Sequence, residues 1–267
     1  MLGPVRVNSL SFRTDLMLRR LEGSTITDHG GYLTIRSPRN PTFWWGNFLL
    51  IPESALQDEA ATWMSWFAGA FPGAAHVAIG VDATGAPALQ PPGYRAAGFR
   101  LERSTVLTAA AVREPPHRND AALFRRLETE DDWRQAVELQ VASSDEPAAA
   151  REFCERRIAD QRRLAEAGHG ACFGAFQGGR LAAHLGLFSD GGPVARYQNV
   201  GTHPAARRQG LAGTLVYHAG RYGLGALGAS TLVIVADPDY SAIRIYRSVG
   251  FADQEIQLSL EREPAHP

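Results

Sequence analysis

The chain has 267 residues, of which 45% are hydrophobic and 21% charged, a composition ordinary for a globular protein of one large or two moderate domains. Its formal net charge of -1 provides no overall field that would attract nucleic acid or an anionic membrane. All 27 basic residues are arginine, which excludes mechanisms that need a catalytic lysine. No stretch reaches the roughly 18 apolar residues of a membrane helix, so a cytoplasmic protein is expected.

The two cysteines, Cys154 and Cys172, fit no disulfide framework and no metal-ligand spacing. Both lie in apolar surroundings, where a free thiol usually packs as a small hydrophobic side chain. We therefore expect two buried, unreactive thiols and no metal site.

Aromatic side chains are concentrated in the N-terminal half. Trp63, Trp66 and Phe67 repeat at helical spacing, which favours burial of these rings in the core. The alternative is that aromatic residues line a binding pocket, because they offer large rigid contact surfaces. The residues concerned are Phe43, Trp44, Trp45, Trp63 and Trp66.

A short pattern occurs twice along the chain. Tyr94-Arg95-Ala96-Ala97-Gly98-Phe99 and Tyr246-Arg247-Ser248-Val249-Gly250-Phe251 share Tyr, Arg, Gly and Phe at the same offsets. Each copy follows an apolar, strand-like run, residues 77–82 in the first case and 232–237 in the second. The repetition favours an internal duplication. The alternative is coincidence, since short helices commonly end at glycine before a strand.

Residues 109–120 contain two prolines and several polar residues, and are predicted to be a linker. This divides the chain into a domain at residues 1–108 and another at 121–267. The second domain shows a mixed α/β pattern. Its expected strands are 123–126, 171–176, 181–188, 194–200, 231–235 and 255–260, and its expected helices are 129–141, 148–167, 208–222 and 241–249. Gly178 and Gly179 predict a hairpin turn between the second and third of these strands.

The segment 200–214 has the features of an anion site. It runs from a strand end, through a turn that contains Pro204, into a predicted helix that opens with Gly210 and Gly213. The first amides of a helix lack internal partners, and their dipoles sum to a partial positive charge. Glycine lets the backbone approach phosphate oxygens closely, and Arg207 and Arg208 add positive charge beside them.

The context of this segment is more specific than the segment alone. Arg207-x-x-Gly210-x-Ala212 follows a strand that ends in Val200-x-Thr202-x-Pro204, and about thirty residues later comes Ala242-x-x-x-Tyr246-x-x-x-Gly250-Phe251. With this arrangement the chain resembles the GNAT superfamily of acyl-CoA-dependent N-acetyltransferases, over roughly residues 121–263. The resemblance implies an α/β (α+β) fold, with a mixed central sheet of GNAT type in the C-terminal half. It also implies acetyl-CoA as co-substrate and no metal.

By this resemblance the strand before the motif holds the pantetheine arm through backbone groups, and the amides of the motif cradle the pyrophosphate. The expected cofactor-binding residues are Val200, Thr202, Arg207, Arg208, Gln209, Gly210, Leu211, Ala212, Gly213 and Thr214. Asp239 lies where many family members carry an asparagine that contacts the cofactor arm. An ionised aspartate accepts hydrogen bonds but donates none, so that contact is expected to differ.

Tyr246 is the candidate catalytic acid. A phenol with an ordinary pKa of about 10 stays protonated at neutral pH and is able to protonate a departing thiolate. Tyr246 also matches the tyrosine that the family often places near the sulfur of CoA. The alternative is a tyrosine that only packs or binds the cofactor.

The sequence offers several candidate routes for removal of the amine proton. Many relatives carry a glutamate on the strand before the motif, whereas this strand reads Arg196-Tyr197-Gln198-Asn199-Val200 and contains no carboxylate. Water held by Gln198 or Asn199 is one candidate route for the proton. The others are His184, which lies on an apolar strand, and His203, whose neighbour Pro204 favours a role in the turn.

If the N-terminal half is a copy, its counterpart of the motif is missing. Residues 40–52 are a candidate for the corresponding strand, and residues 53–66 lack R-x-x-G-x-A and begin with acids. We expect a smaller, degenerate GNAT-like half that does not bind acetyl-CoA and covers the acceptor site.

The leading interpretation is an enzyme that acetylates a primary amine of a small molecule by direct attack on the thioester. The expected form is a monomer that acts as a pseudo-dimer of its two halves, or a homodimer, without nucleic-acid or membrane partners. Two alternatives are a protein or peptide N-acetyltransferase and a non-catalytic acyl-CoA-binding module.

Overall fold

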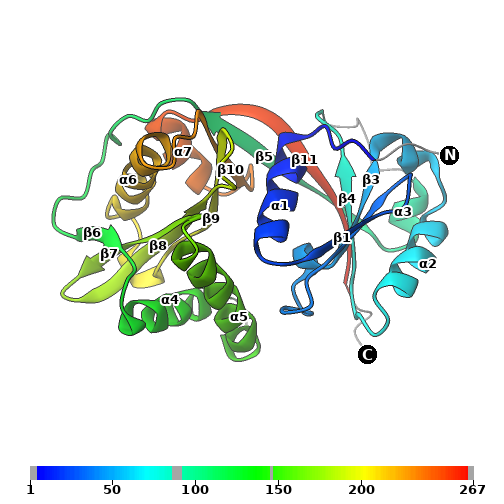
Figure 1. Cartoon of the computed structure of the whole chain (residues 1–267), viewed down its shortest axis with the longest axis horizontal. Coiled ribbons are helices and arrows are strands. Elements are labelled where there is room, and N and C mark those ends of the chain that lie inside the picture. The colour runs from blue at the N-terminus through cyan, green and yellow to red at the C-terminus, as the bar shows by residue number, and fades with distance from the viewer. Residues whose placement is uncertain (1–4, 86–91, 145–146, 264–267) are drawn as a thin grey trace. The chain divides into compact units, whose positions relative to one another are not determined.

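The computed structural model describes residues 5–85, 92–144 and 147–263, and for 147–149 it describes the backbone alone. These residues form two compact units, each with its own hydrophobic core. Unit 1 contains the described residues up to Val106 and those from Glu255 onward, and unit 2 is Leu107–Gln254. The units are mixed α/β structures (Figure 1).

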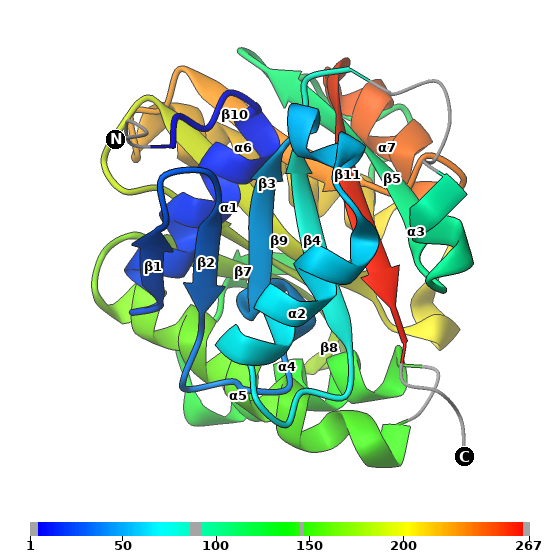
Figure 2. The same ribbon diagram turned by 90° about the vertical axis from the view of Figure 1, so that its right-hand side faces the viewer.

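Unit 1 is built around a sheet in the order β1-β2-β3-β4-β11. Its elements are α1 (Leu10–Leu21), β1 (Thr25–Asp28), β2 (Leu33–Arg36), η1 (Trp44–Gly46), β3 (Phe48–Pro52), η2 (Glu53–Gln57), α2 (Ala60–Ala70), β4 (Val77–Asp82), α3 (Pro92–Ala96) and most of β5 (Arg100–Ala109). The pairs β1–β2 and β2–β3 are antiparallel, and β3–β4 is parallel. Figure 2 shows these strands side by side with α2 in front of them.

The first helix of unit 1 is held by two carboxylates from distant parts of the chain. Asp82, at the end of β4, accepts hydrogen bonds from the backbone N–H groups of Asn8 and Ser9 and from the Ser9 hydroxyl. Glu255 accepts one from the N–H of Leu10 at 2.7 Å. Carboxylates are favourable at a helix N-terminus because they accept hydrogen bonds from its free amides and interact favourably with the positive end of the helix dipole.

Unit 2 contains the strands β6 to β10, in the sheet order β10-β9-β8-β7-β6. Its elements are β6 (Leu123–Arg126), α4 (Glu130–Ala142), α5 (Pro147–Glu166), β7 (Gly170–Gln177), β8 (Arg180–Phe188), β9 (Val194–Thr202), η3 (Pro204–Ala206), α6 (Leu211–Gly225), β10 (Thr231–Ala236), α7 (Ala242–Val249) and the start of β11 (Ala252–Arg262). Of the four strand pairs in this order, β9–β10 is parallel and the other three are antiparallel. Helices α4 and α5 cover one face of the sheet and α6 and α7 the other (Figure 1).

Local sequence signals explain where several of these elements begin. A capping box starts α4, because Thr129 accepts from the N–H of Asp132 while Asp132 accepts from the N–H of Thr129. A bidentate pair with Arg125 holds the pKa of Asp132 well below its usual range. The predicted hairpin turn is confirmed, with Gly178 and Gly179 at φ of 56° and 80°.

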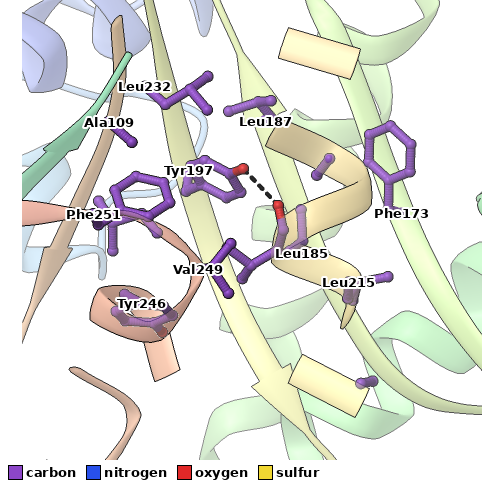
Figure 3. Packing of buried hydrophobic residues seen from close by; sticks show 14 of the residues in the cluster. Ala109, Phe173, Leu185, Leu187, Tyr197, Leu215, Leu232, Tyr246, Val249 and Phe251 are labelled. Carbon is purple, nitrogen blue, oxygen red and sulfur yellow. Dashed lines mark hydrogen bonds between the residues drawn. The ribbon is translucent and has the colours of Figure 1, made fainter. Parts of the chain in front are cut away.

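Close packing of α6 on the sheet depends on glycines. A Cβ at Gly220 would lie 2.9 Å from the Tyr197 hydroxyl, and one at Gly223 would lie 2.7 Å from a methyl of Leu187. The Tyr197 hydroxyl instead donates to the carbonyl of Val216 at 2.8 Å, and its ring meets Phe251 edge-on (Figure 3). This packing fixes the position of α6, and with it the loop that precedes the helix.

The two units repeat one series of elements. From α1 to β5 and from α5 to β11 the order is helix, three strands, helix, strand, helix, strand, with the same antiparallel, antiparallel and parallel pairing. The repeated sequence pattern also has one local structure. Phe99 and Phe251 donate to the carbonyls of Tyr94 and Tyr246, with glycines at positive φ before them. The predicted duplication therefore has a structural counterpart.

The boundaries of the units differ from those expected from the sequence. The end of β11, Leu258–Arg262, pairs antiparallel with β4 and so belongs to unit 1, whereas it was expected in the C-terminal domain. The expected linker, residues 109–120, packs within unit 2. Strand alternation predicts that a segment is extended, but the partner strand is chosen by tertiary packing.

Other expectations have mixed outcomes. Cys154 and Cys172 are buried as predicted, and burial raises the pKa of both thiols. Trp63 and Phe67 are buried in the core of unit 1. The prediction was wrong for Trp66, which is 44% exposed and stacks on Tyr32 at 4.8 Å, because it lies on the outer side of α2.

Candidate active site

The loop between β9 and α6 begins with a tight turn. The Nδ1 atom of His203 accepts a hydrogen bond from the N–H of Ala205, and Pro204–Ala206 form one 3-10 turn. Arg208 and Gly210 then adopt positive φ angles of 64° and 77°. Helix α6 therefore begins at Leu211, three residues after the expected start, because left-handed residues cannot continue a right-handed helix.

Gly210 is required by both conformation and space. Besides its positive φ, a Cβ at this position would lie 2.3 Å from the carbonyl oxygen of His117. The neighbouring Asn119 ties the segment to the loop: its N–H donates to the Thr214 hydroxyl at 2.9 Å and its amide donates to the carbonyl of Gln209 at 2.8 Å. The segment before the first strand of unit 2 thus packs directly against the start of α6.

A cavity of about 740 Å³ lies beside this helix start, within unit 2. Its walls come from the segment before β6, the ends of α4 and β9, the motif loop and helix α7. The lining residues are Pro115, Pro116, His117, Ser143, Val200, Gly201, Thr202, Ala206, Arg207, Arg208, Gly210, Leu211, Ala212, Gly213, Tyr240, Ser241, Ala242, Ile245, Tyr246 and Ser248. The volume is typical of a site for a sizeable small molecule.

Most of the expected cofactor-binding residues line this cavity together with Tyr246. Three do not. Gln209 accepts from Gln177 and Asn119, and Thr214 donates to the carbonyl of Gly210, so both hold the loop in place. Asp239 is exposed, and its backbone N–H donates to Asp237.

The cavity joins a positive end to an apolar wall. The first amides of the 15-residue helix α6 have no partners within the helix, and its first turn contains no acidic residue. Arg207 and Arg208 are exposed beside them. Val200, Leu211 and Ile245 supply apolar surface. The arrangement suits a long ligand with an anionic end and an apolar arm.

Strand β9 is distorted where it borders the cavity. His184 of β8 pairs with Gly201, while Gly186 pairs with Gln198, so Asn199 and Val200 together face a single residue of β8. Asn199 has a φ of 52°. This is a β-bulge, and it leaves backbone groups of the strand unpaired by the sheet and available to a ligand.

Tyr246 lies on α7 (Figure 3). Its side chain is buried, with 5% exposure. Burial, with a smaller effect of Tyr240, raises the pKa of its phenol to about 12. The phenol therefore stays protonated through the neutral range, as a hydrogen-bond donor must.

The candidate bases are in different places. His184 is fully buried and, with Asn199, lines a second, smaller cavity next to β9. Gln198 accepts from Arg157 and donates to the carbonyl of Tyr197, so its amide is engaged. His203 shapes its turn as expected and lines a separate cavity against α4.

Sequence reasoning missed part of the cavity wall. Pro115, Pro116 and His117 fall in the expected linker, and no sequence pattern marks Ser143 or Tyr240. The consecutive prolines were a usable signal, because they stiffen a segment that then packs as a rigid wall. Across the described residues, no cluster of three or more His, Cys, Asp or Glu side chains is placed to hold a metal. None of the helices in the described parts of the chain has the length and apolarity to cross a membrane.

Comparison with known proteins agrees with this geometry. Residues 131–251 match the family model described as the acetyltransferase (GNAT) family. No curated protein matches the chain. Among solved structures, a GCN5-related N-acetyltransferase from Kribbella flavida is similar over 97% of each chain, with 14% identity and a TM-score of 0.62.

Two further structures share the fold over most of their length. A functionally unknown conserved protein from Staphylococcus epidermidis matches over 91% of this chain and 95% of its own, with 11% identity and a TM-score of 0.70. A tandem GNAT protein from the clavulanic acid biosynthesis pathway matches over 99% and 98%, with 13% identity and a TM-score of 0.55. At these identities the likeness establishes the fold.

Proposed function

We propose that the chain, whose residues 131–251 match the acetyltransferase (GNAT) family model, transfers an acetyl group from acetyl-CoA to a primary amine of a small molecule. The observation that carries the proposal is the 740 Å³ cavity, which places the start of α6, the bulged end of β9 and Tyr246 around one space. The three parts of acetyl-CoA each match one of these walls. The start of α6 suits the phosphates, the bulged end of β9 suits the pantetheine arm, and Tyr246 suits the thioester.

In this proposal the pyrophosphate binds the free amides of Gly210 to Gly213, and Arg207 and Arg208 neutralise further phosphate charge. The pantetheine arm runs along Val200 and Thr202, where the bulge offers unpaired backbone groups. The acetyl group then lies near the bulge, with Tyr246 on the side of the sulfur.

The reaction forms a bond between the amine nitrogen and the thioester carbonyl carbon and breaks the bond from that carbon to sulfur. A backbone N–H near Val200 stabilises the negative charge on the carbonyl oxygen. The Tyr246 phenol donates to the departing thiolate, and its proton passes to sulfur as the carbon–sulfur bond breaks. The amine gives one proton to solvent and the Tyr246 phenolate regains one from solvent, so the products are an amide and free CoA.

The test begins with binding. Calorimetry with acetyl-CoA and with S-acetylpantetheine, which lacks the phosphates, measures how much of the affinity the helix start supplies. We expect acetyl-CoA to bind more than about tenfold tighter, since charged hydrogen bonds are each worth about 1.5–3 kcal/mol. Absence of acetyl-CoA binding contradicts the proposal.

Thiol release is then followed with small amines and with peptides. Turnover on small amines supports the proposal. Turnover on peptides alone favours a protein acetyltransferase, and binding without turnover on any acceptor favours an acyl-CoA-binding module.

A further inference from the structure

The cavity to which His203 contributes, which we call the α4 cavity, is separate from the proposed acetyl-CoA site. Its volume is about 510 Å³, and it shares no lining residue with the cavity that contains Tyr246. Helix α4 forms one wall, the start of β8 after the Gly178–Gly179 turn forms another, and His203 at the start of the motif loop forms a third. A space of this volume is in the range of sites for small molecules.

The lining of the α4 cavity carries one positive charge that is not neutralised. Arg134 pairs with Asp131, and Glu138 accepts hydrogen bonds from Arg151 at 2.9 and 3.0 Å. Arg180 is exposed, and its guanidinium makes no hydrogen bond or ion pair with any residue that the structure describes. An anion in the cavity would therefore meet a free guanidinium.

His203 offers a second donor to the same cavity. Its Nδ1 atom accepts from the N–H of Ala205 at 3.3 Å, so in the neutral imidazole the proton lies on Nε2. None of the described residues accepts a hydrogen bond from this Nε2 atom. The N–H of His203 donates to the carbonyl of Ala182, two residues from Arg180 on β8, so the two donors lie roughly 7 Å apart along the strand.

The remaining walls fit an apolar body. Leu139, Ala142 and Leu181 provide hydrocarbon surface. The amide of Gln135 is already engaged, because it donates to Gly179 and accepts from the N–H of Leu181 at 2.7 Å. One negative charge matches Arg180, whereas a phosphate would bring a second charge close to the Glu138 carboxylate.

We propose that the α4 cavity binds a small monocarboxylate with an apolar body, and that this ligand tightens the binding of acetyl-CoA; the second part rests on the proposed function. A carboxylate that accepts from Nε2 of His203 holds the ring in the tautomer whose Nδ1 accepts from Ala205. That hydrogen bond caps the turn that leads into Arg207 and Arg208 of the acetyl-CoA cavity. Each ligand then raises the affinity for the other by the same factor.

The probe is 3-phenylpropionate, and its control is 3-phenylpropionamide, which has the same shape without the charge. In calorimetric titration of the full chain the acid should bind at least about tenfold tighter than the amide, since hydrogen bonds between charged groups are the stronger ones. Arg180→Gln should weaken binding of the acid at least about tenfold. The matched control, Arg156→Gln, removes an arginine that pairs with Glu152 on α5 outside the cavity, and should leave the Kd unchanged.

Two outcomes overturn the site. One is that the acid does not bind. The other is that wild type and Arg180→Gln bind it equally well.

A second pair of variants tests the place of binding. Ala142 is exposed at the end of α4 and lines the cavity, whereas Ala159 is exposed on α5 and does not. Ala142→Trp fills the space and should abolish binding of 3-phenylpropionate, and Ala159→Trp should leave it unchanged. Equal affinity in these two variants would contradict the assignment to the α4 cavity.

The effect on acetyl-CoA is measured separately. Saturating 3-phenylpropionate should lower the Kd for acetyl-CoA about fivefold in wild type and not at all in Arg180→Gln. A Kd that the probe leaves unchanged in wild type overturns this second part. If acetyl-CoA does not bind under any condition, the proposed function fails, while the titrations with 3-phenylpropionate still decide whether the α4 cavity is a carboxylate site.

Discussion

The two units repeat one series of elements but differ in the connection between the third strand and the next helix. In unit 2 this connection turns through Arg208 and Gly210 in left-handed conformations, and the helix amides open onto a cavity. In unit 1 it forms the 3-10 helix Glu53–Gln57, whose Ala55 and Leu56 are buried. The same series of elements therefore either leaves a cavity at the helix start, as in unit 2, or packs buried side chains in the connection before the helix, as in unit 1. The few residues of the connection make this difference.

The repeated tyrosines show the same difference. Tyr246 lines the cavity of unit 2, whereas the hydroxyl of Tyr94 donates to the carbonyl of Ala55 at 3.5 Å, within the connection itself. Asp58 and Glu59 precede α2 in unit 1, whereas Arg207 and Arg208 precede the corresponding helix α6 in unit 2. Carboxylates before the helix repel phosphate, so under the proposed function we expect unit 2, and not unit 1, to bind acetyl-CoA.

The largest expected difference between the units is in acetyl-CoA binding, which we expect in unit 2 and not in unit 1. Calorimetric titration with acetyl-CoA should give one site per chain, because in the described part of the chain the helix after the third strand has carboxylates in front of its free amides in unit 1 but not in unit 2. A stoichiometry of two would show that the connection in unit 1 does not prevent binding.

Gly210→Ala is expected to weaken acetyl-CoA binding at least about a hundredfold. The new methyl would meet the His117 carbonyl at 2.3 Å and strain a φ of 77°, which displaces the start of α6. The matched control is Gly73→Ala in unit 1, where φ is 87° but nothing lies within 4 Å of the new Cβ. Comparable losses in both variants would mean that strain in general, and not this contact, weakens binding.

The buried histidines make stability depend on pH. Burial lowers the pKa of His184 from 6.5 to about 4, so below pH 6.5 the unfolded chain binds the proton more readily than the folded one. Stability should therefore fall by about 2 kcal/mol between pH 6.5 and 4.5 through this group. Urea unfolding of His184→Gln across this range should show a flatter profile.

His76 of unit 1, stacked on Trp44 at 4.6 Å, provides the comparison. Burial lowers the pKa of His76 as well, so His76→Gln should flatten the profile in the same direction and by less, since His184 is the more completely buried group. An unchanged slope in His184→Gln would contradict the lowered pKa.

The smallest expected effect is the loss of turnover on removal of the Tyr246 hydroxyl. Tyr246→Phe should lower turnover about tenfold, which corresponds to about 1.4 kcal/mol of transition-state stabilisation, with acetyl-CoA affinity nearly unchanged. Tyr94→Phe, the same change in the other unit, should leave turnover as it is. If Tyr246→Phe retains full turnover, the phenol only packs against the ligand.

Local patterns were sufficient for most of what the sequence predicted. Apolar periodicity placed the strands and helices of unit 2, Gly178 and Gly179 marked the hairpin, and the motif from Arg207 to Ala212 with Tyr246 located the cavity. Each of these signals depends on residues that are near one another in the chain or on a known combination of motifs.

Other features were decided only by tertiary structure. The pairing of β11 with β4, the packing of His117 against Gly210 and the outward position of Trp66 all depend on contacts between distant segments. The bulge at Asn199 and the smaller cavity beside His184 also need three dimensions, because the register between β8 and β9 has no local signature. The sequence by itself indicated the family resemblance, the strands and helices of unit 2 and the position of the Arg207–Ala212 motif. The shape of the cavities around that motif depends on the distant segments that pack against it, which only the tertiary structure brings together.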